Sequence, residues 1–388
     1  MELCSRESCT ACGACITVCP KKCIEFKKDE YGFLFPIIDK VQCIQCGKCV
    51  SSCHILNKPD LVYPNEAYAA WSNDSEDRKS STSGGAASVF YQTVVANGGI
   101  GYGAVYDDNL NVVIRGYDNE DIVKFKNSKY VYSSMGNVFL EIRKNLLERK
   151  MVLFIGLPCQ TAAIKTYLGK EYDSLILVDI VCHGTPPQQY LNEHISAIEK
   201  KCGKKTCHIK FRNDNEFEFM CFDSCCDKPF FSRTKNADAY LLPFFEALTY
   251  RDSCYCCTYA QNKRVADITI GDFWGLGLKK PFNHPYTGAI SLVLINTSKG
   301  KQFFEMAKSR MFTEEREVSE GIEGNAQLNT PSIKNENRER FLSLYITNGF
   351  DEAVGKIYGD YMKKQNVIYK RQKRKLVFRK TIKKILGK

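Results

Sequence analysis

The spacing of apolar and polar residues predicts an alternation of helices and strands through most of the chain. It predicts helices at 86–96 and 138–147, with short strands in "GGIGYGAVYD" and "VVIRGYD" between them. From residue 151, the apolar runs "MVLFIG" and "SLILVDIV" flank the helical segment "QTAAIKTYL". That order predicts a βαβ unit with parallel strands and a right-handed crossover. Two more strands are predicted in "ADITIGD" and "GAISLVLIN", and residues 300–362 are predicted to be helical and polar.

This pattern predicts an α/β protein with a partly parallel sheet, preceded by a small cysteine-rich domain. The linker "NKPDLVYPNEAY" contains Pro and Asn and marks a boundary near residue 60. We expect a cysteine-rich domain over 1–60 and a larger unit in two parts, 65–147 and 148–325. A helical extension over 326–362 and a basic tail over 363–388 complete the expected organisation.

Twenty cysteines in 388 residues change the picture more than any other feature of the composition. No charged segment followed by an apolar one precedes Cys4, so we expect no secretory signal and a cytoplasmic protein. Reduced cysteines in that compartment favour metal binding over disulfides. No apolar run approaches the roughly 18 residues that a membrane-spanning helix needs.

The net charge of +11 is concentrated at the C-terminus. Residues 363–388 hold 12 Lys and Arg and no acid, which leaves the rest of the chain at −1. Phe378, Ile382 and Ile385 would share one face of a basic helix there, so the tail can contact the inner face of a membrane or can be a solvated terminal helix. No groove-reading motif accompanies the charge, so we expect no nucleic acid partner.

The N-terminal cysteines form two quartets with one spacing. "CTACGACITVCP" and "CIQCGKCVSSC" both follow C-x2-C-x2-C-x3-C, with His54 where a proline often stands. In two-cluster bacterial ferredoxins, the fourth cysteine of each quartet binds the other cluster. The spacing therefore predicts a bacterial-ferredoxin-like domain with two 4Fe-4S clusters. The first is held by Cys9, Cys12, Cys15 and Cys53, and the second by Cys43, Cys46, Cys49 and Cys19.

Zinc ribbons are the alternative, but they use two widely separated CxxC pairs for each ion and give no reason for duplicated quartets. Cys4 and Cys23 lie outside the repeat and are interpreted as bystanders. Two redox clusters favour electron relay, which requires a group elsewhere in the chain that exchanges electrons with a substrate.

Four further cysteines are predicted to meet at one edge of the sheet. Cys159 and Cys182 each follow one of the two parallel strands, and sites in open α/β sheets form at that carboxyl edge. In "DSCYCCTYA", Cys254 and Cys257 form a CxxC pair and Cys256 must point elsewhere. The four thiols suit a third 4Fe-4S cluster. The alternative is that Cys159 and Cys182 are small buried core residues.

Five motifs in order resemble the coenzyme F420 hydrogenase/dehydrogenase beta-subunit family. They are "SSTSGG", "NSKYVYSSMG", "GLPCQTAA", "VCHG" and "ADITIGDFWG", and the resemblance covers about residues 65–320. It implies a unit that binds FAD and a 4Fe-4S cluster and passes electrons between a deazaflavin, ferredoxin or another carrier and a substrate. Similar architectures occur beside polysaccharide-synthesis enzymes, so polysaccharide biosynthesis and a small-molecule or lipid-linked substrate are also implied.

The same resemblance assigns candidate FAD contacts. Ser83, Gly84 and Gly85 precede a helix whose N-terminus favours a pyrophosphate, although such a turn is also an ordinary linker. Lys129 can neutralise a phosphate or contact the flavin, or be a solvated lysine. Asp272 can bind a ribose hydroxyl or cap a turn.

His183 can shuttle a proton to the flavin or bond only to local backbone. The function predicted is a flavin- and iron–sulfur-dependent oxidoreductase. An electron-transfer subunit that feeds a partner enzyme, and a zinc-stabilised interaction protein, are the alternatives. Five cysteines fit no motif and are interpreted as reduced bystanders: Cys202, Cys207, Cys221, Cys225 and Cys226.

Overall fold

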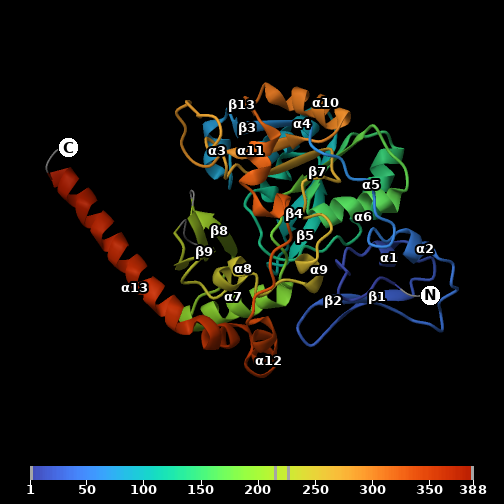
Figure 1. The fold of residues 1–388 in the computed structure, drawn as a ribbon. Coiled ribbons are helices and arrows are strands. Elements are labelled where there is room, and N and C mark those ends of the chain that lie inside the picture. Colours follow the sequence, from blue (N-terminus) through green and yellow to red (C-terminus); the bar gives the residue numbers. More distant parts are fainter. Residues whose placement is uncertain (1–2, 214–215, 225–227, 386–388) are drawn as a thin grey trace. The chain divides into compact units, whose positions relative to one another are not determined.

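A computed structural model describes residues 3–213, 216–224 and 228–385, without the side chains of 370 and 372–385 (Figure 1). Cys225 and Cys226 therefore lie outside the described residues, as do the side chains of Phe378, Ile382 and Ile385. Internal contacts divide the chain into two compact units, one formed by residues 1–188 and 250–333 and the other by 189–249 and 334–388.

The first unit begins with the cysteine-rich segment. Along the chain, two strands that form an antiparallel hairpin come between two short helices. Each helix starts at a left-handed glycine, Gly13 or Gly47. Figure 1 shows the two helices on the same side of this hairpin. The elements are α1 (Ala14–Thr17), β1 (Ile24–Lys28), β2 (Leu34–Ile38) and α2 (Lys48–Ser51).

An eight-stranded mixed sheet forms the rest of the first unit, in the order β13-β3-β12-β11-β7-β6-β4-β5. The four strands β11, β7, β6 and β4 are parallel, and the outer pairs are antiparallel. The predicted parallel βαβ unit is therefore confirmed. The strands are β3 (Glu66–Ser72), β4 (Ile100–Tyr106), β5 (Val112–Tyr117), β6 (Val152–Gly156), β7 (Leu175–Ile180), β11 (Ile268–Asp272), β12 (Ser291–Ile295) and β13 (Met311–Arg316).

Helices cover both faces of this sheet. On one face, α4 and α10 bury Phe90, Phe303 and Phe304 against the strands, and each buried ring contributes about 1.5–3 kcal/mol. On the other face, α5 and α6 pack near β6 and α11 packs near β12. The helices are α3 (Ser75–Ser80), α4 (Ala86–Ala96), α5 (Val138–Leu147), α6 (Pro158–Leu168), α9 (Asp252–Tyr255), α10 (Ser298–Lys308) and α11 (Val318–Glu323), with 3-10 turns η1 (Glu120–Phe125) and η2 (Ala326–Leu328).

The second unit pairs a small antiparallel sheet with helices. Its core includes the protonated His194, whose pKa rises to about 10 because the Asp238 and Asp351 carboxylates outweigh the desolvation that opposes them. Figure 1 shows α13 as one continuous helix beside α12 at its start. The elements are α7 (Gln188–Cys202), β8 (His208–Asn213), β9 (Glu216–Phe222), β10 (Phe231–Thr234), α8 (Leu241–Phe245), α12 (Arg338–Asn348) and α13 (Phe350–Ile385).

The predicted helices at 86–96 and 138–147 are confirmed as α4 and α5. The helical prediction for 300–362 is wrong at Met311–Arg316, which forms the edge strand β13 against β3. An edge strand has one side without a neighbouring strand and can carry polar residues there. Thr313, Glu314 and Glu315 interrupt the apolar alternation from which a strand is predicted. No described helix is long and apolar enough to cross a membrane.

Candidate functional site

The two cysteine loops have the same backbone conformation. Within each loop, Ala11 and Gln45 have φ near +54° and +53°, and Gly13 and Gly47 follow with +83° and +78°. These left-handed residues turn the chain so that successive cysteines face one point. Equal dihedrals at equal positions show that the repeat in the sequence is also a repeat in structure.

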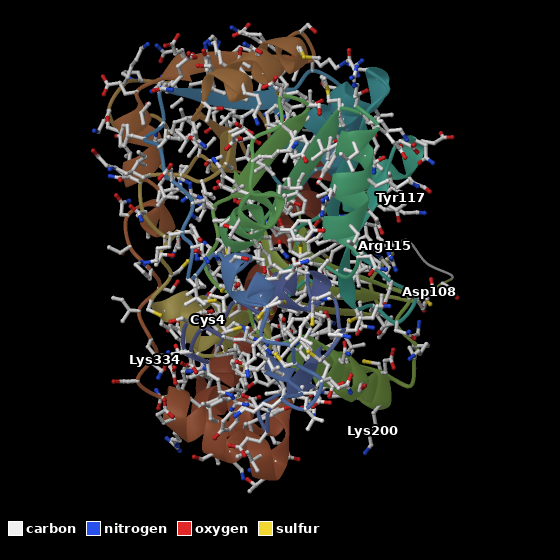
Figure 2. The ribbon with its side chains drawn as sticks, turned by 90° about the vertical axis from the view of Figure 1, so that its right-hand side faces the viewer. Cys4, Asp108, Arg115, Tyr117, Lys200 and Lys334 are labelled. Atoms are coloured by element: carbon white, nitrogen blue, oxygen red, sulfur yellow. The ribbon has the colours of Figure 1, made fainter. Side chains whose placement is uncertain are left out.

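The first predicted quartet is mostly buried. Cys9 and Cys53 are buried, and Cys12 and Cys15 are partly buried. The neighbouring Cys4, labelled in Figure 2, lies outside the repeat. Its thiol lowers the pKa of Cys9 to about 7 and the pKa of Cys53 to about 6, against the opposing effect of burial.

The second predicted quartet is more exposed. Cys46 is exposed, and only Cys49 of the four is buried. Burial raises the pKa of Cys49, and the neighbouring thiols of Cys43 and Cys46 add to that rise. Cys23 accompanies this quartet as Cys4 accompanies the first, because its sulfur lies 3.4 Å from that of Cys19.

One cavity of about 50 Å³ is lined by the four cysteines predicted to meet at the sheet edge. Cys159 lies in the first turn of α6 after β6 ends, and Cys182 lies just beyond β7. Cys254 and Cys257 reach the cavity from α9 and the residues after it. Cys256 does not line it: its side chain is exposed, with Sγ 3.8 Å from the carbonyl oxygens of Glu7 and Asp252.

Electrostatics link these four thiols to one another. Desolvation raises the pKa of Cys159 strongly, and the charges of Cys257, Cys182 and Cys254 raise it further. Desolvation likewise raises the pKa of Cys257 to about 11, again with help from Cys254. Crowded thiols such as Cys159, Cys182 and Cys257, whose pKa values are all raised, need compensating positive charge before they can ionise together.

Two buried arginines supply positive charge at the cavity wall. Arg264 lies 2.9 Å from the Asp179 carboxylate and favours the thiolate forms of Cys182 and Cys257. Arg251 donates to the carbonyl oxygens of Cys9 at 3.0 Å and Leu34 at 2.6 Å. Sequence reasoning did not find either arginine, because nothing in the local pattern shows that a basic residue is buried.

The first quartet adjoins the cavity. Cys12 is one of the lining residues, and the Tyr132 hydroxyl donates to the Ala11 carbonyl at 2.8 Å. Next to Cys53, His54 is fully buried, with Nε2 2.9 Å from Thr10 Oγ1 and Nδ1 2.7 Å from the hydroxyl of Tyr259. Burial lowers the pKa of His54 to about 4, so the imidazole is neutral near pH 7.

The predicted FAD residues lie close together at one end of the sheet. Ser83, Gly84 and Gly85 precede α4, and a Cβ at Gly84 would lie 2.2 Å from the Ala70 carbonyl oxygen. The Ser291 hydroxyl donates to Ser83 Oγ at 3.3 Å, and Ser291 pairs with Asp272 across β12 and β11.

The second predicted FAD motif packs on the first. The Ser128 amide donates to Thr82 Oγ1 at 3.1 Å. The Lys129 ammonium donates to three backbone carbonyl oxygens, of Phe125, Lys126 and Asn127. Lys129 is partly buried, and desolvation lowers its pKa to about 7. Its bonds to three carbonyls hold the ammonium against the backbone of residues 125–127.

His183 is linked to both the cavity, which it lines, and Asp272, whose charge acts on it. It lines the cavity beside Cys182, and its carbonyl accepts from the Ser332 hydroxyl at 2.7 Å. Desolvation lowers the pKa of His183, and the Asp272 carboxylate opposes that shift. The structure thus brings His183 toward both the thiols and the predicted FAD residues.

The cysteines that fit no motif are all in the second unit. Cys202 and Cys207 are exposed and Cys221 is buried on β9. Across the described residues, no group of three His, Cys, Asp or Glu side chains is arranged to hold a single metal ion.

Two family models match separate parts of the chain. Residues 149–321 match the model for the C-terminal part of the beta subunit of coenzyme F420 hydrogenase/dehydrogenase, and residues 8–61 match the model for a 4Fe-4S dicluster domain. These matches confirm the resemblance drawn from the motifs. The dicluster match supports two 4Fe-4S clusters in the N-terminal domain.

Individual relatives are distant. The F subunit of the F(420)H(2) dehydrogenase of Methanosarcina mazei is 22% identical over 331 residues, which cover 80% of this chain and 85% of that protein. An uncharacterized protein of Methanocaldococcus jannaschii is 24% identical over 205 residues, covering 45% of this chain and 56% of that protein. A chain of the F420-reducing NiFe hydrogenase complex from Methanosarcina barkeri has a TM-score of 0.46 and 17% identity, covering 71% of this chain and 97% of that chain.

Proposed function

Because residues 149–321 match the coenzyme F420 hydrogenase/dehydrogenase beta-subunit model and residues 8–61 match a 4Fe-4S dicluster domain, we propose that this chain is an iron–sulfur flavoprotein oxidoreductase of that family. It passes electrons between an external carrier, either a ferredoxin-like protein or a deazaflavin such as coenzyme F420, and an unidentified substrate. Iron–sulfur clusters transfer single electrons, and a flavin joins them to two-electron chemistry.

We assign a third cluster to Cys159, Cys182, Cys254 and Cys257. The support is that all four line one cavity, although they come from three separate segments of the chain. A single ion needs its thiolates about 2.3 Å from one centre, whereas a cluster gives each thiolate its own iron. Arg264 and Arg251 would offset the negative charge of such a group.

The observation that carries the proposal is the shared cavity wall. Cys12, from the first N-terminal quartet, lines the same cavity as Cys159 and Cys257. His54 and Tyr259 form a hydrogen bond between the residue after Cys53 and the segment after Cys257. A relay from the N-terminal domain to the sheet edge would therefore cross no solvent gap.

For FAD, the supporting residues are those around the N-terminus of α4. The helix dipole favours a phosphate beside Ser83 and Gly84, and Lys129 can add positive charge when protonated. Asp272 lies at the carboxyl end of β11, where ligands of parallel sheets bind. His183, which lines the cavity with the cysteines and is acted on by the charge of Asp272, is the candidate for holding a proton near the flavin.

A second candidate function is an electron-transfer subunit that feeds a partner enzyme. It is favoured by the M. mazei relative, which is named as a dehydrogenase subunit. In that case the substrate chemistry, including any role in polysaccharide biosynthesis on a lipid-linked substrate, would belong to the partner. We also propose a cytoplasmic location, with the basic residues of the 363–388 tail contacting the membrane surface.

Anaerobic reduction with candidate donors separates these functions. The purified chain is mixed with reduced coenzyme F420, with a reduced ferredoxin and with dithionite, and cluster and flavin absorption are followed separately. Flavin reduction and substrate turnover by the isolated chain would support the oxidoreductase. Cluster reduction without bound flavin or turnover would support the subunit, and colourless zinc-loaded protein would contradict both.

A further inference from the structure

The loop that carries the second quartet is almost entirely exposed. Val41 keeps 95% of its surface accessible and Ile44 keeps 57%, on either side of Cys43. Cys46 is itself exposed. A large apolar side chain left open beside a redox ligand is typical of a binding surface rather than a folding requirement.

Four lysines surround this apolar pair. Lys40 and Lys48 come from the loop itself, and Lys21 and Lys22 follow Cys19. The Lys22 amide donates to the Cys19 carbonyl at 3.1 Å, which ties this segment to the same quartet. All four side chains are exposed, and residues 18–24 and 40–53 contain no Asp or Glu.

The nearest acid in the sequence, Asp39, offsets one of these four positive charges and leaves an excess of three. Asp39 accepts from the Val41 amide at 2.9 Å and from Gln42 Nε2 at 2.9 Å, so its carboxylate is used to shape the loop. The Asp39 amide donates to the Cys23 carbonyl at 2.8 Å and holds the loop beside residues 21–23. The lysines therefore form one patch around Val41 and Ile44.

We propose that this patch, defined by Lys21, Lys22, Lys40, Val41, Ile44 and Lys48, docks a small electron-carrier protein with an acidic face. The inference rests on the proposed function and deepens it, because it identifies the surface and charge of the carrier. Opposite charges steer the encounter, and the apolar pair forms the dry centre of the contact. The second quartet is thereby the point of electron entry or exit.

The test uses the full chain with its clusters and an acidic two-cluster ferredoxin as the probe. Stopped-flow spectroscopy measures how fast the reduced ferredoxin reduces the clusters at low and at high ionic strength. At low salt, the double variant Lys40→Glu with Lys48→Glu should be reduced by ferredoxin at least about tenfold more slowly than the wild type. Added salt should bring the rates of the variant and the wild type closer together. Val41→Ser should also slow the reaction, with less dependence on salt.

Lys58→Glu is the control for charge reversal outside the patch, because this exposed lysine lies beyond residues 40–53 and follows Asn57, whose carbonyl accepts from Thr166 of α6. Iron content and the rate of reduction by dithionite should be equal in all variants. Equal ferredoxin rates in the double variant and the control would overturn the docking surface while leaving the proposed function intact. Wild-type protein without iron would overturn both.

Discussion

The two N-terminal quartets share one spacing and one backbone conformation but lie in opposite surroundings. The segments of the first contact the buried Arg251 and Tyr259 and the partly buried Tyr132, and it adjoins the thiol-lined cavity. The second presents Cys46, Val41 and four lysines to solvent. Two copies of one motif can therefore have different roles, because the rest of the chain buries one and leaves the other accessible.

The residue after the fourth cysteine marks this difference. Cys19 is followed by the exposed Pro20, and Cys53 is followed by the fully buried His54. Proline has no backbone N–H group and no polar side chain, so Pro20 cannot donate a hydrogen bond. His54 uses both ring nitrogens, toward Thr10 and Tyr259, and so fastens the first quartet to the segment that carries Cys257.

The largest expected effect comes from removing one ligand from each quartet. Cys53→Ser and Cys46→Ser should each lose about four irons per chain. Only Cys46→Ser should still allow dithionite to reduce the proposed third cluster and the proposed flavin at the wild-type rate, since it leaves the buried quartet complete. Electron paramagnetic resonance and flavin absorption after mixing measure this. A normal flavin rate in Cys53→Ser would show that electrons bypass the buried quartet.

Replacing Arg251 should affect the buried quartet selectively. Arg251→Leu leaves the carbonyls of Cys9 and Leu34 without their donor, which should cost about 3 kcal/mol of unfolding free energy. It should also lower the reduction potential of the first cluster more than that of the second, because a nearby positive charge is lost. Anaerobic urea unfolding and redox titration measure both, with Arg251→Lys as the charge-preserving control. Equal shifts of both potentials would contradict the assignment.

Exchanging the residue after the fourth cysteine should have a smaller effect. His54→Pro removes the bonds to Thr10 and Tyr259 and should lower the unfolding free energy by about 2 kcal/mol, without loss of iron. Pro20→Ala, at the equivalent exposed position, should change it by less than about 0.5 kcal/mol. Chemical unfolding of both variants measures the two free energies of unfolding. Similar decreases in the two variants would mean that the hydrogen bonds of His54 do not hold the first quartet in place.

The smallest effects are expected at the extra thiol beside each quartet. Cys4→Ala and Cys23→Ala should keep all their iron and lose no more than about 1 kcal/mol, since both lie outside the repeat. Iron analysis checks this directly. Loss of a whole cluster in either variant would make that cysteine a ligand and would revise its quartet.

Much of the site follows from local sequence. The ferredoxin loops are set by short spacings and two glycines, and the positions of Cys159 and Cys182 follow from the direction of two parallel strands. The same reasoning placed α4 and α5 correctly, because their apolar residues repeat with helical spacing.

What could not be predicted depends on contacts between distant segments. Arg251 and Cys9 are 242 residues apart, and His54 and Tyr259 are 205 apart, so no local pattern reveals that either pair is buried together. The short polar strand β13 was missed for a related reason, because its pairing with β3 rather than its own alternation makes it a strand. The antiparallel β8–β10 sheet was missed although β8 ("HIKFRN") and β9 ("EFEFMCF") do alternate polar and apolar residues, so that sheet could have been predicted from the sequence.

The central claim is that a third cluster lies next to the buried quartet, and the most direct test is iron and sulfide per chain after anaerobic purification. The account predicts about 12 irons in the wild type and in Cys256→Ala, and about 8 in Cys257→Ala. Cys256 is exposed, whereas Cys257 lines the cavity. About 8 irons in the wild type, or a loss in Cys256→Ala rather than in Cys257→Ala, would contradict it.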